Sequence, residues 1–112
     1  MSFNIIPLSS FIRELKRLAK KYPSLKQDYT NLLDEIEANP KLGIQIGRNC
    51  YKIRLSITSK GKGKSGGARV ITYLIVNVEG ETLYLLKIYD KGDQDNVSEA
   101  ELKHLLATVN IS

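Results

Sequence analysis

The spacing of apolar residues changes at Tyr51, and this change constrains the fold more than any other feature of the chain. Over residues 11–22 and 24–39 apolar side chains recur every three or four residues, which predicts two amphipathic helices with a break at Pro23. From Tyr51 to Ile57 every second residue is apolar, which predicts a half-buried strand. A helical hairpin therefore comes before a group of strands.

The remaining elements follow from the same two patterns. Further strands are predicted at 3–7, 68–78 and 82–91, and a last amphipathic helix at 98–109. The order β-α-α-β-β-β-α predicts a two-layer α+β fold, with an N-terminal helical hairpin and a C-terminal helix on one face of an antiparallel sheet. With no repeat and no long linker, residues 1–112 are expected to form a single domain.

Strand alternation also predicts which side chains share the face of the sheet that the helices leave open. These side chains are Lys52, Arg54, Arg69, Tyr73, Lys87, Tyr89 and Lys91. Because Ile71 and Ile75 fall on the same face, its far end is expected to be covered.

Positive charge is concentrated in one region. The net charge is +5, from 17 Lys and Arg against 12 Asp and Glu, and no acidic residue lies between Ala38 and Val78. The basic residues of that stretch are Lys41, Arg48, Lys52, Arg54, Lys60, Lys62, Lys64 and Arg69. Regional positive charge favours a polyanionic partner over a merely solvated surface.

Several classes of function are excluded by what the chain lacks. One cysteine, Cys50, and one histidine, His104, cannot supply a zinc site or a nucleophile–His–acid arrangement, so no metal or other cofactor is expected. Residues 63–65 match the end of a phosphate-binding P-loop, but Thr58 replaces the required glycine and a strand follows, which excludes nucleoside triphosphate binding. A single cysteine, together with no secretory signal and no long apolar run, predicts a cytoplasmic protein.

The remaining chemistry is that of an RNA-binding surface. Lysine and arginine bind phosphate oxygens, and Tyr73 and Tyr89 can either stack on unpaired bases or pack into the core. The candidate RNA-binding residues are Lys60, Lys62, Lys64, Tyr73, Lys87 and Arg48. Such a face can also cut RNA without a metal, because clustered cations lower the pKa of a lysine that then removes the 2′-hydroxyl proton, while arginines stabilise the phosphorane.

Four segments resemble one known family. Residues 50–55 read CYKIRL and resemble the central strand of RelE-type toxins. Residues 60–73 read KGKGKSGGARVITY and resemble the HigB branch of the RelE/ParE superfamily. Residues 85–91 resemble the last strand of that branch, and with residues 39–43 the resemblance covers roughly residues 10–108.

This resemblance implies a bacterial toxin of a type II toxin–antitoxin pair. Family members cut messenger RNA in the ribosomal decoding site, using the 2′-hydroxyl and no metal. The implied partners are the ribosome, messenger RNA and a cognate antitoxin, which is expected to be acidic where it covers the basic face and to carry a helix-turn-helix DNA-binding domain.

The resemblance also implies roles for individual residues. Lys52 and Arg54 match the paired basic residues proposed as base and charge stabiliser, Arg69 matches the arginine on the scissile phosphate, and Lys91 matches a basic residue after the last strand. The chain departs from the RelE pattern at 92–93, where another arginine is expected, and at 97–98, near the expected tyrosine acid/base. Tyr89 is the candidate substitute for that tyrosine.

Two other functions remain open. One is a ParE-like DNA gyrase inhibitor with the same fold and no catalysis, and the other is a non-catalytic RNA-binding module. The basic residues Lys52, Arg54 and Arg69 favour the nuclease, since a gyrase inhibitor needs no phosphate clamp on its sheet.

Overall fold

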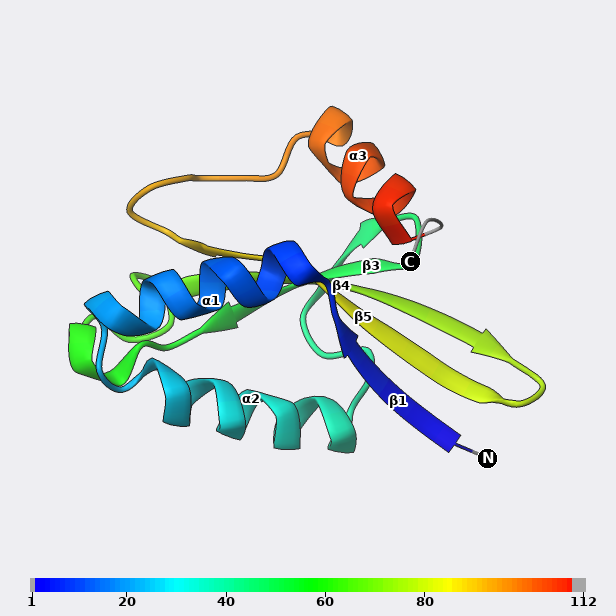
Figure 1. Cartoon of the computed structure of the whole chain (residues 1–112), viewed down its shortest axis with the longest axis horizontal. Helices are drawn as coiled ribbons and strands as arrows, with labels where there is room; N and C mark the ends of the chain where they lie inside the picture. Colours follow the sequence, from blue (N-terminus) through cyan, green and yellow to red (C-terminus); the bar gives the residue numbers. More distant parts are fainter. Residues whose placement is uncertain (1, 110–112) are drawn as a thin grey trace.

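The computed structural model describes residues 2–109, which form a five-stranded sheet with helices packed against it (Figure 1). In chain order the elements are β1 (Ser2–Pro7), α1 (Ser9–Lys21), α2 (Leu25–Ala38), β2 (Ile44–Gly47), β3 (Cys50–Leu55), the short 3₁₀ helix η1 (Thr58–Lys60), β4 (Ala68–Asn77), β5 (Gly80–Asp90) and α3 (Glu99–Val109). The strand order is β1-β5-β4-β3-β2. The predicted α+β class is confirmed.

The predicted direction of the first strand is wrong. β1 runs parallel to β5, pairing Ser2 with Gly80 and Pro7 with Leu85, whereas every other pair in the sheet is antiparallel. A parallel pair needs a long crossover connection, and the chain between β1 and β5 supplies one. The sheet is therefore mixed, a property that the alternation of side chains does not reveal.

The edge strand β2 was not predicted. Its sequence, IQIG, is only four residues long, too short for a clear alternating pattern, and most of its residues are exposed. β2 joins β3 through a two-residue turn in which Arg48 and Asn49 have φ values of 52° and 61°. Positive φ at both central residues is the mark of a type I′ hairpin, whose twist matches that of the flanking strands.

One face of the sheet buries the helical hairpin. Phe11, Leu18 and Leu25 from the helices lie in one core with Val70 and Ile88 from the central strands, all at most 1% exposed. The side chains that alternate with Val70 on β4 and with Ile88 on β5 fall on the opposite face. The helical hairpin therefore leaves the other face to the cationic residues.

The C-terminal helix packs on that other face, so the predicted two-layer arrangement is wrong for α3. Figure 1 shows α3 on one side of the strands and α2 on the other. Cys50 and Ile71 share the face of Lys52 and Arg69 yet are fully buried. These apolar side chains require cover, and the apolar residues of α3 belong to the same core cluster.

Candidate nucleic-acid interface

The register of the three central strands brings the predicted site residues into two rows. One row places Arg54 opposite Arg69 and Arg69 opposite Tyr89, and the next places Lys52 and Lys87 on either side of Ile71. Directly opposite residues on one face of an antiparallel pair have Cβ atoms about 5 Å apart. The predicted sharing of one face is therefore observed for all five polar residues.

Two of these residues are not open to solvent, contrary to the expectation from alternation alone. Arg69 is 5% exposed and Tyr89 is 3% exposed. The Tyr89 hydroxyl has no hydrogen-bond partner within the described chain. Burial raises the pKa of Tyr89, although the charge of Arg69 acts in the opposite direction. In this conformation Tyr89 is shielded from a phosphate and is poorly suited to transfer a proton.

The Arg69 guanidinium is already bound to protein carbonyls. Its Nη1 donates to the carbonyl oxygens of Lys64 at 2.9 Å and Ala68 at 3.1 Å, and its Nη2 donates to that of Ser65 at 3.1 Å. These acceptors belong to the end of the glycine- and lysine-rich connection and the start of β4. The charged group is therefore directed at backbone carbonyls of the protein itself.

Several cations among the predicted site residues have partners from one segment of the chain, residues 95–101. The pairs are Lys87 with Glu101, Lys91 with Asp95 at 2.8 Å, Arg48 with Glu99 at 2.7 Å, and Lys52 with the Asn96 side-chain oxygen at 3.2 Å. Acidic residues that lie outside the basic stretch in sequence thus offset part of its charge in space. The hydrogen bond of Lys91 also lowers the pKa of Asp95.

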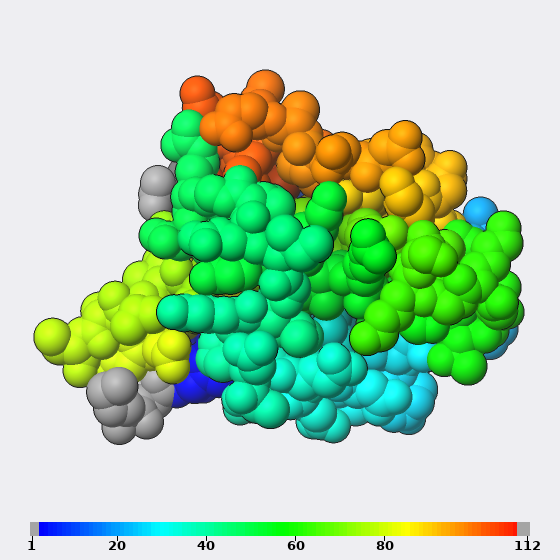
Figure 2. Space-filling model, turned by 180° about the vertical axis from the view of Figure 1, so that it is seen from behind, coloured from blue at the N-terminus to red at the C-terminus, as the bar shows by residue number. Residues whose placement is uncertain are grey.

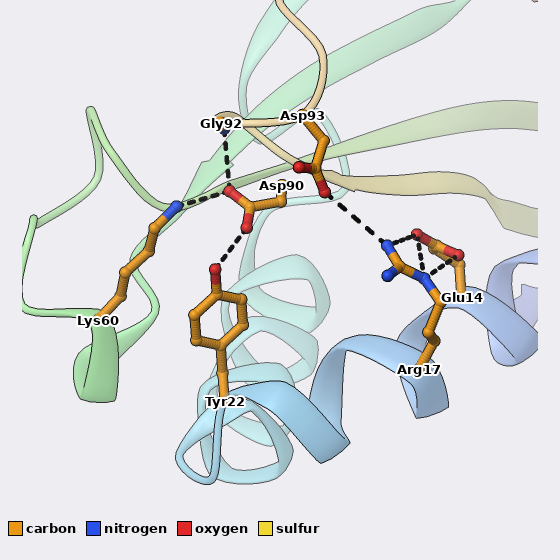
Figure 3. Close-up of polar contacts among 7 residues, drawn as sticks. All are labelled: Glu14, Arg17, Tyr22, Lys60, Asp90, Gly92 and Asp93. Carbon is orange, nitrogen blue, oxygen red and sulfur yellow. Dashed lines mark hydrogen bonds and ion pairs between the residues drawn. The ribbon is translucent and has the colours of Figure 1, made fainter.

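Lys60, a predicted RNA contact, forms an ion pair with the buried Asp90 (Figure 3). Asp90 is 3% exposed and accepts hydrogen bonds from Lys60 Nζ at 2.5 Å, the Tyr22 hydroxyl at 2.6 Å and the Gly92 amide at 2.9 Å. Burial by itself raises the pKa of Asp90, but these three hydrogen bonds lower it to about 2. Lys60 therefore ties η1 to the ends of α1 and β5, and its charge is committed to Asp90.

Tyr73 is also engaged in packing. Its ring stacks on that of Tyr84 with a centroid separation of 6.2 Å and an interplanar angle of 25°. Tyr73 and Tyr51 line a groove of about 470 Å³ together with Val76. This groove is distinct from the one that holds the basic residues of β3.

Three predicted residues come together around an open groove of about 460 Å³, formed by Lys52 and Arg54 of β3 and by Lys64. Arg54 and Lys64 also line an adjoining groove of about 170 Å³ against α2. Both side chains are exposed, and neither has an ion pair or side-chain hydrogen bond with any residue that the structure describes. Figure 2 shows this side of the molecule, with residues 40–50 in teal, the connection before β4 in green and α3 in orange.

Sequence reasoning missed Glu35, which lines both grooves from α2. In the sequence Glu35 is only one of several polar residues on the outer side of an amphipathic helix. Its carboxylate opposes anion binding beside Arg54 and Lys64. No signal in the sequence distinguishes it from Glu37, because only the packing of α2 beside β3 brings it to the groove.

No group of His, Cys, Asp and Glu suited to holding a metal ion occurs in residues 2–109. Within the same range no helix has the length and apolar character needed to cross a membrane. Burial raises the pKa of the Cys50 thiol to about 11, which keeps this side chain protonated and unreactive at neutral pH.

Comparison with known families decides the class. The model of the RelE toxin of the RelE/RelB toxin–antitoxin system matches residues 11–111. The chain belongs to the RelE toxin family. The predicted superfamily is thereby confirmed, whereas the HigB-like branch stays a prediction.

Solved structures of the Escherichia coli RelE toxin have the same fold as this RelE family member. A double arginine-to-alanine mutant of E. coli RelE in the free state is 14% identical, with a TM-score of 0.59, and the match covers 97% of this chain and 99% of that chain. The isolated E. coli toxin is 15% identical, with a TM-score of 0.56, and the match covers 96% and 99% of the two chains.

Proposed function

We propose that this RelE family toxin is a ribosome-dependent endoribonuclease that cuts messenger RNA without a metal and thereby inhibits translation. The observation that carries the proposal is the groove in which Lys52, Arg54 and Lys64 face a common space. Three cations around one open groove suit a phosphodiester, and Arg54 and Lys64 are free to bind it. We also propose that the toxin acts in the cytoplasm and that a cognate antitoxin neutralises it. The antitoxin is proposed to be acidic where it covers this groove.

We propose a role for each of the three cations that line the groove. Arg54 binds the non-bridging oxygens of the scissile phosphate through its planar guanidinium and stabilises the extra charge of the phosphorane. Lys52 exchanges its hydrogen bond with Asn96 for the RNA and takes the proton of the attacking 2′-hydroxyl. The bond between phosphorus and the 5′-oxygen then breaks, and solvent water donates a proton to that leaving oxygen. Lys64 holds a neighbouring phosphate as a point charge.

The proposal leaves Arg69, Tyr89, Lys60 and Lys91 out of direct contact with RNA. The first two are buried, and the two lysines are paired with Asp90 and Asp95. Lys62 is exposed on the same connection as Lys64 and is proposed as a further phosphate contact. Lys87 and Arg48 can contact RNA only after their ion pairs with residues 95–101 break. Tyr73 can stack on a base only after its ring separates from that of Tyr84.

Single-turnover cleavage of messenger RNA on programmed ribosomes tests the nuclease. Lys52→Ala and Arg54→Ala are each expected to slow cleavage by about 10²–10³-fold, the size of losing a general base or a charge stabiliser. Lys16→Ala, on the exposed side of α1, is the matched control and is expected to cut at the wild-type rate. Wild-type rates for both Lys52→Ala and Arg54→Ala would end the proposal.

The second candidate is a non-catalytic toxin of the same fold that inhibits DNA gyrase, a function that needs neither Arg69 nor Tyr89 open to solvent. Primer extension on messenger RNA after induction of the toxin separates the two. Discrete cuts within codons support the nuclease, whereas intact messages with arrested replication support the gyrase inhibitor. The glycine- and lysine-rich residues 60–67 support placement in the HigB-like branch of the family.

A further inference from the structure

Residues 61–67, here called the lysine loop, are joined to one another by a single backbone hydrogen bond among those that the structure describes. The loop joins η1 to β4 and contains four glycines, so ordering it costs more backbone entropy than ordering most loops of that length. Its internal backbone bond, from the Gly67 amide to the Lys64 carbonyl, is long at 3.4 Å. Some other group must therefore stabilise the loop.

The end of the loop is fixed to the sheet by close contact. A Cβ atom at Gly67 would lie 2.1 Å from the Leu55 carbonyl oxygen, so only glycine fits there. The Gly67 carbonyl accepts a hydrogen bond from the Lys91 amide at 3.0 Å. These contacts place the base of the loop beside β3 and β5, but they do not reach Lys64.

The side chain that does reach Lys64 is Arg69. Its three hydrogen bonds go to the carbonyls of Lys64, Ser65 and Ala68, which are spread over five residues of backbone. Charge-assisted hydrogen bonds are stronger than neutral ones, and the planar guanidinium directs them to several acceptors at once. A lysine ammonium carries the same charge but lacks the planar arrangement of N–H donors. It therefore cannot make these three hydrogen bonds at once.

We infer that Arg69 is a positioning residue that shapes the lysine loop and so places Lys64 over the groove of Lys52 and Arg54, rather than a residue that binds the RNA phosphate itself. This inference rests on the proposed RNA-binding function. Arg69 thereby acts through Lys64, because its guanidinium N–H groups are bound to backbone carbonyls of the protein.

Binding of a short single-stranded RNA with 2′-methoxy groups, which cannot be cut by 2′-hydroxyl attack, tests the inference in a double-mutant cycle with the full chain. Lys64→Gln and Arg69→Lys are each expected to weaken binding by about ten-fold, the equivalent of one hydrogen bond to a charged group. The double variant is expected to bind no more weakly than Arg69→Lys alone, because the Lys64 contact is already lost.

The salt dependence of binding separates positioning from direct contact. Losing one phosphate contact lowers the slope of log affinity against log salt by about 0.7 for a single strand. Arg69→Lys keeps the charge, so a direct phosphate ligand would keep the wild-type slope, whereas a positioning residue loses the slope contribution of Lys64. The inference would be overturned if the loss of affinity in the double variant equalled the product of the two single losses. It would also be overturned if Arg69→Lys kept the wild-type slope of log affinity against log salt.

A second variant covers the case in which Arg69→Lys does not fold. Gly63 has a φ of +64° with open space around it, so Gly63→Val disturbs the loop without contacting Arg69 or the core. It is expected to weaken RNA binding and to show the same non-additivity with Lys64→Gln, and full wild-type affinity in Gly63→Val would refute the inference. If the wild-type chain binds no RNA, the proposed function itself fails, an outcome distinct from RNA binding with additive effects.

Discussion

Replacing Asp90 with asparagine tests whether the buried cluster in Figure 3 holds the ends of α1, η1 and β5 together. The pKa of Asp90 falls from its ordinary value of 3.8 to about 2, because hydrogen bonds from Lys60, Tyr22 and Gly92 outweigh its burial. At 1.36 kcal/mol per pKa unit, this shift corresponds to about 2 kcal/mol of folding free energy. That is a large part of the total stability of a small domain.

The sign of the pH dependence follows from the direction of the shift. Because the pKa is lower in the folded protein, the contribution of Asp90 is fully present above about pH 4 and is lost as the pH falls towards 2. Asp90→Asn does not titrate. We therefore expect the variant to be less stable than the wild type by about 2 kcal/mol near pH 5, and the difference to shrink by about 2 kcal/mol near pH 2.

Urea unfolding followed by circular dichroism at a series of pH values measures these differences. The matched control is Asp93→Asn, since Asp93 is 57% exposed and lies 3.9 Å from Arg17 in an ion pair of little strength. It is expected to change the free energy of unfolding by less than about 0.5 kcal/mol at any pH. A stability gap between the wild type and Asp90→Asn that does not change with pH would refute the assigned role of the carboxylate.

Three further substitutions test other parts of the molecule, and a fourth, Ile12→Ala, is the control for the last of them. Glu35→Gln removes the negative charge from the groove and is expected to tighten RNA binding several-fold at low salt and less at high salt, measured by fluorescence anisotropy; unchanged binding would remove Glu35 from the groove's electrostatics. Glu101→Gln breaks the ion pair with Lys87, which is expected to cost under about 1 kcal/mol in urea unfolding while also tightening RNA binding. Leu18→Ala is expected to cost about 2–5 kcal/mol because Leu18 is fully buried, whereas Ile12→Ala on the exposed side of α1 is expected to cost much less in the same assay.

The sequence predicted much of the candidate site because strand alternation depends only on local geometry. Lys52, Arg54 and Arg69 were placed on one face from their spacing alone, and the register confirms that arrangement. Alternation does not reveal what covers a face, however. Arg69 is buried with its guanidinium on loop carbonyls, and Tyr89 is buried in the core cluster, and both arrangements depend on tertiary packing.

The pairing of charges was also out of reach of the sequence. The local sequence of residues 95–101 predicts a loop followed by the start of a helix. Nothing in it indicates that its acidic residues form ion pairs with Lys87 and Arg48. In the sequence Lys60 is one of several lysines in a glycine-rich segment, and only the fold brings Asp90, thirty residues later, beside it. Long-range ion pairs depend on how elements pack, and that packing leaves no periodic trace in the sequence.

Local patterns by themselves determined the helices, the three long strands, the α+β class and the concentration of positive charge, because each depends on neighbours within a few residues. Tertiary structure alone decided that β1 runs parallel to β5, that α3 lies on the cationic face, and that Lys52, Arg54 and Lys64 keep an open groove while other cations are paired. The physical reason is that hydrophobic periodicity records only whether a side chain is buried. Which distant element buries it, and which charge it then meets, depends on the packing of the whole chain.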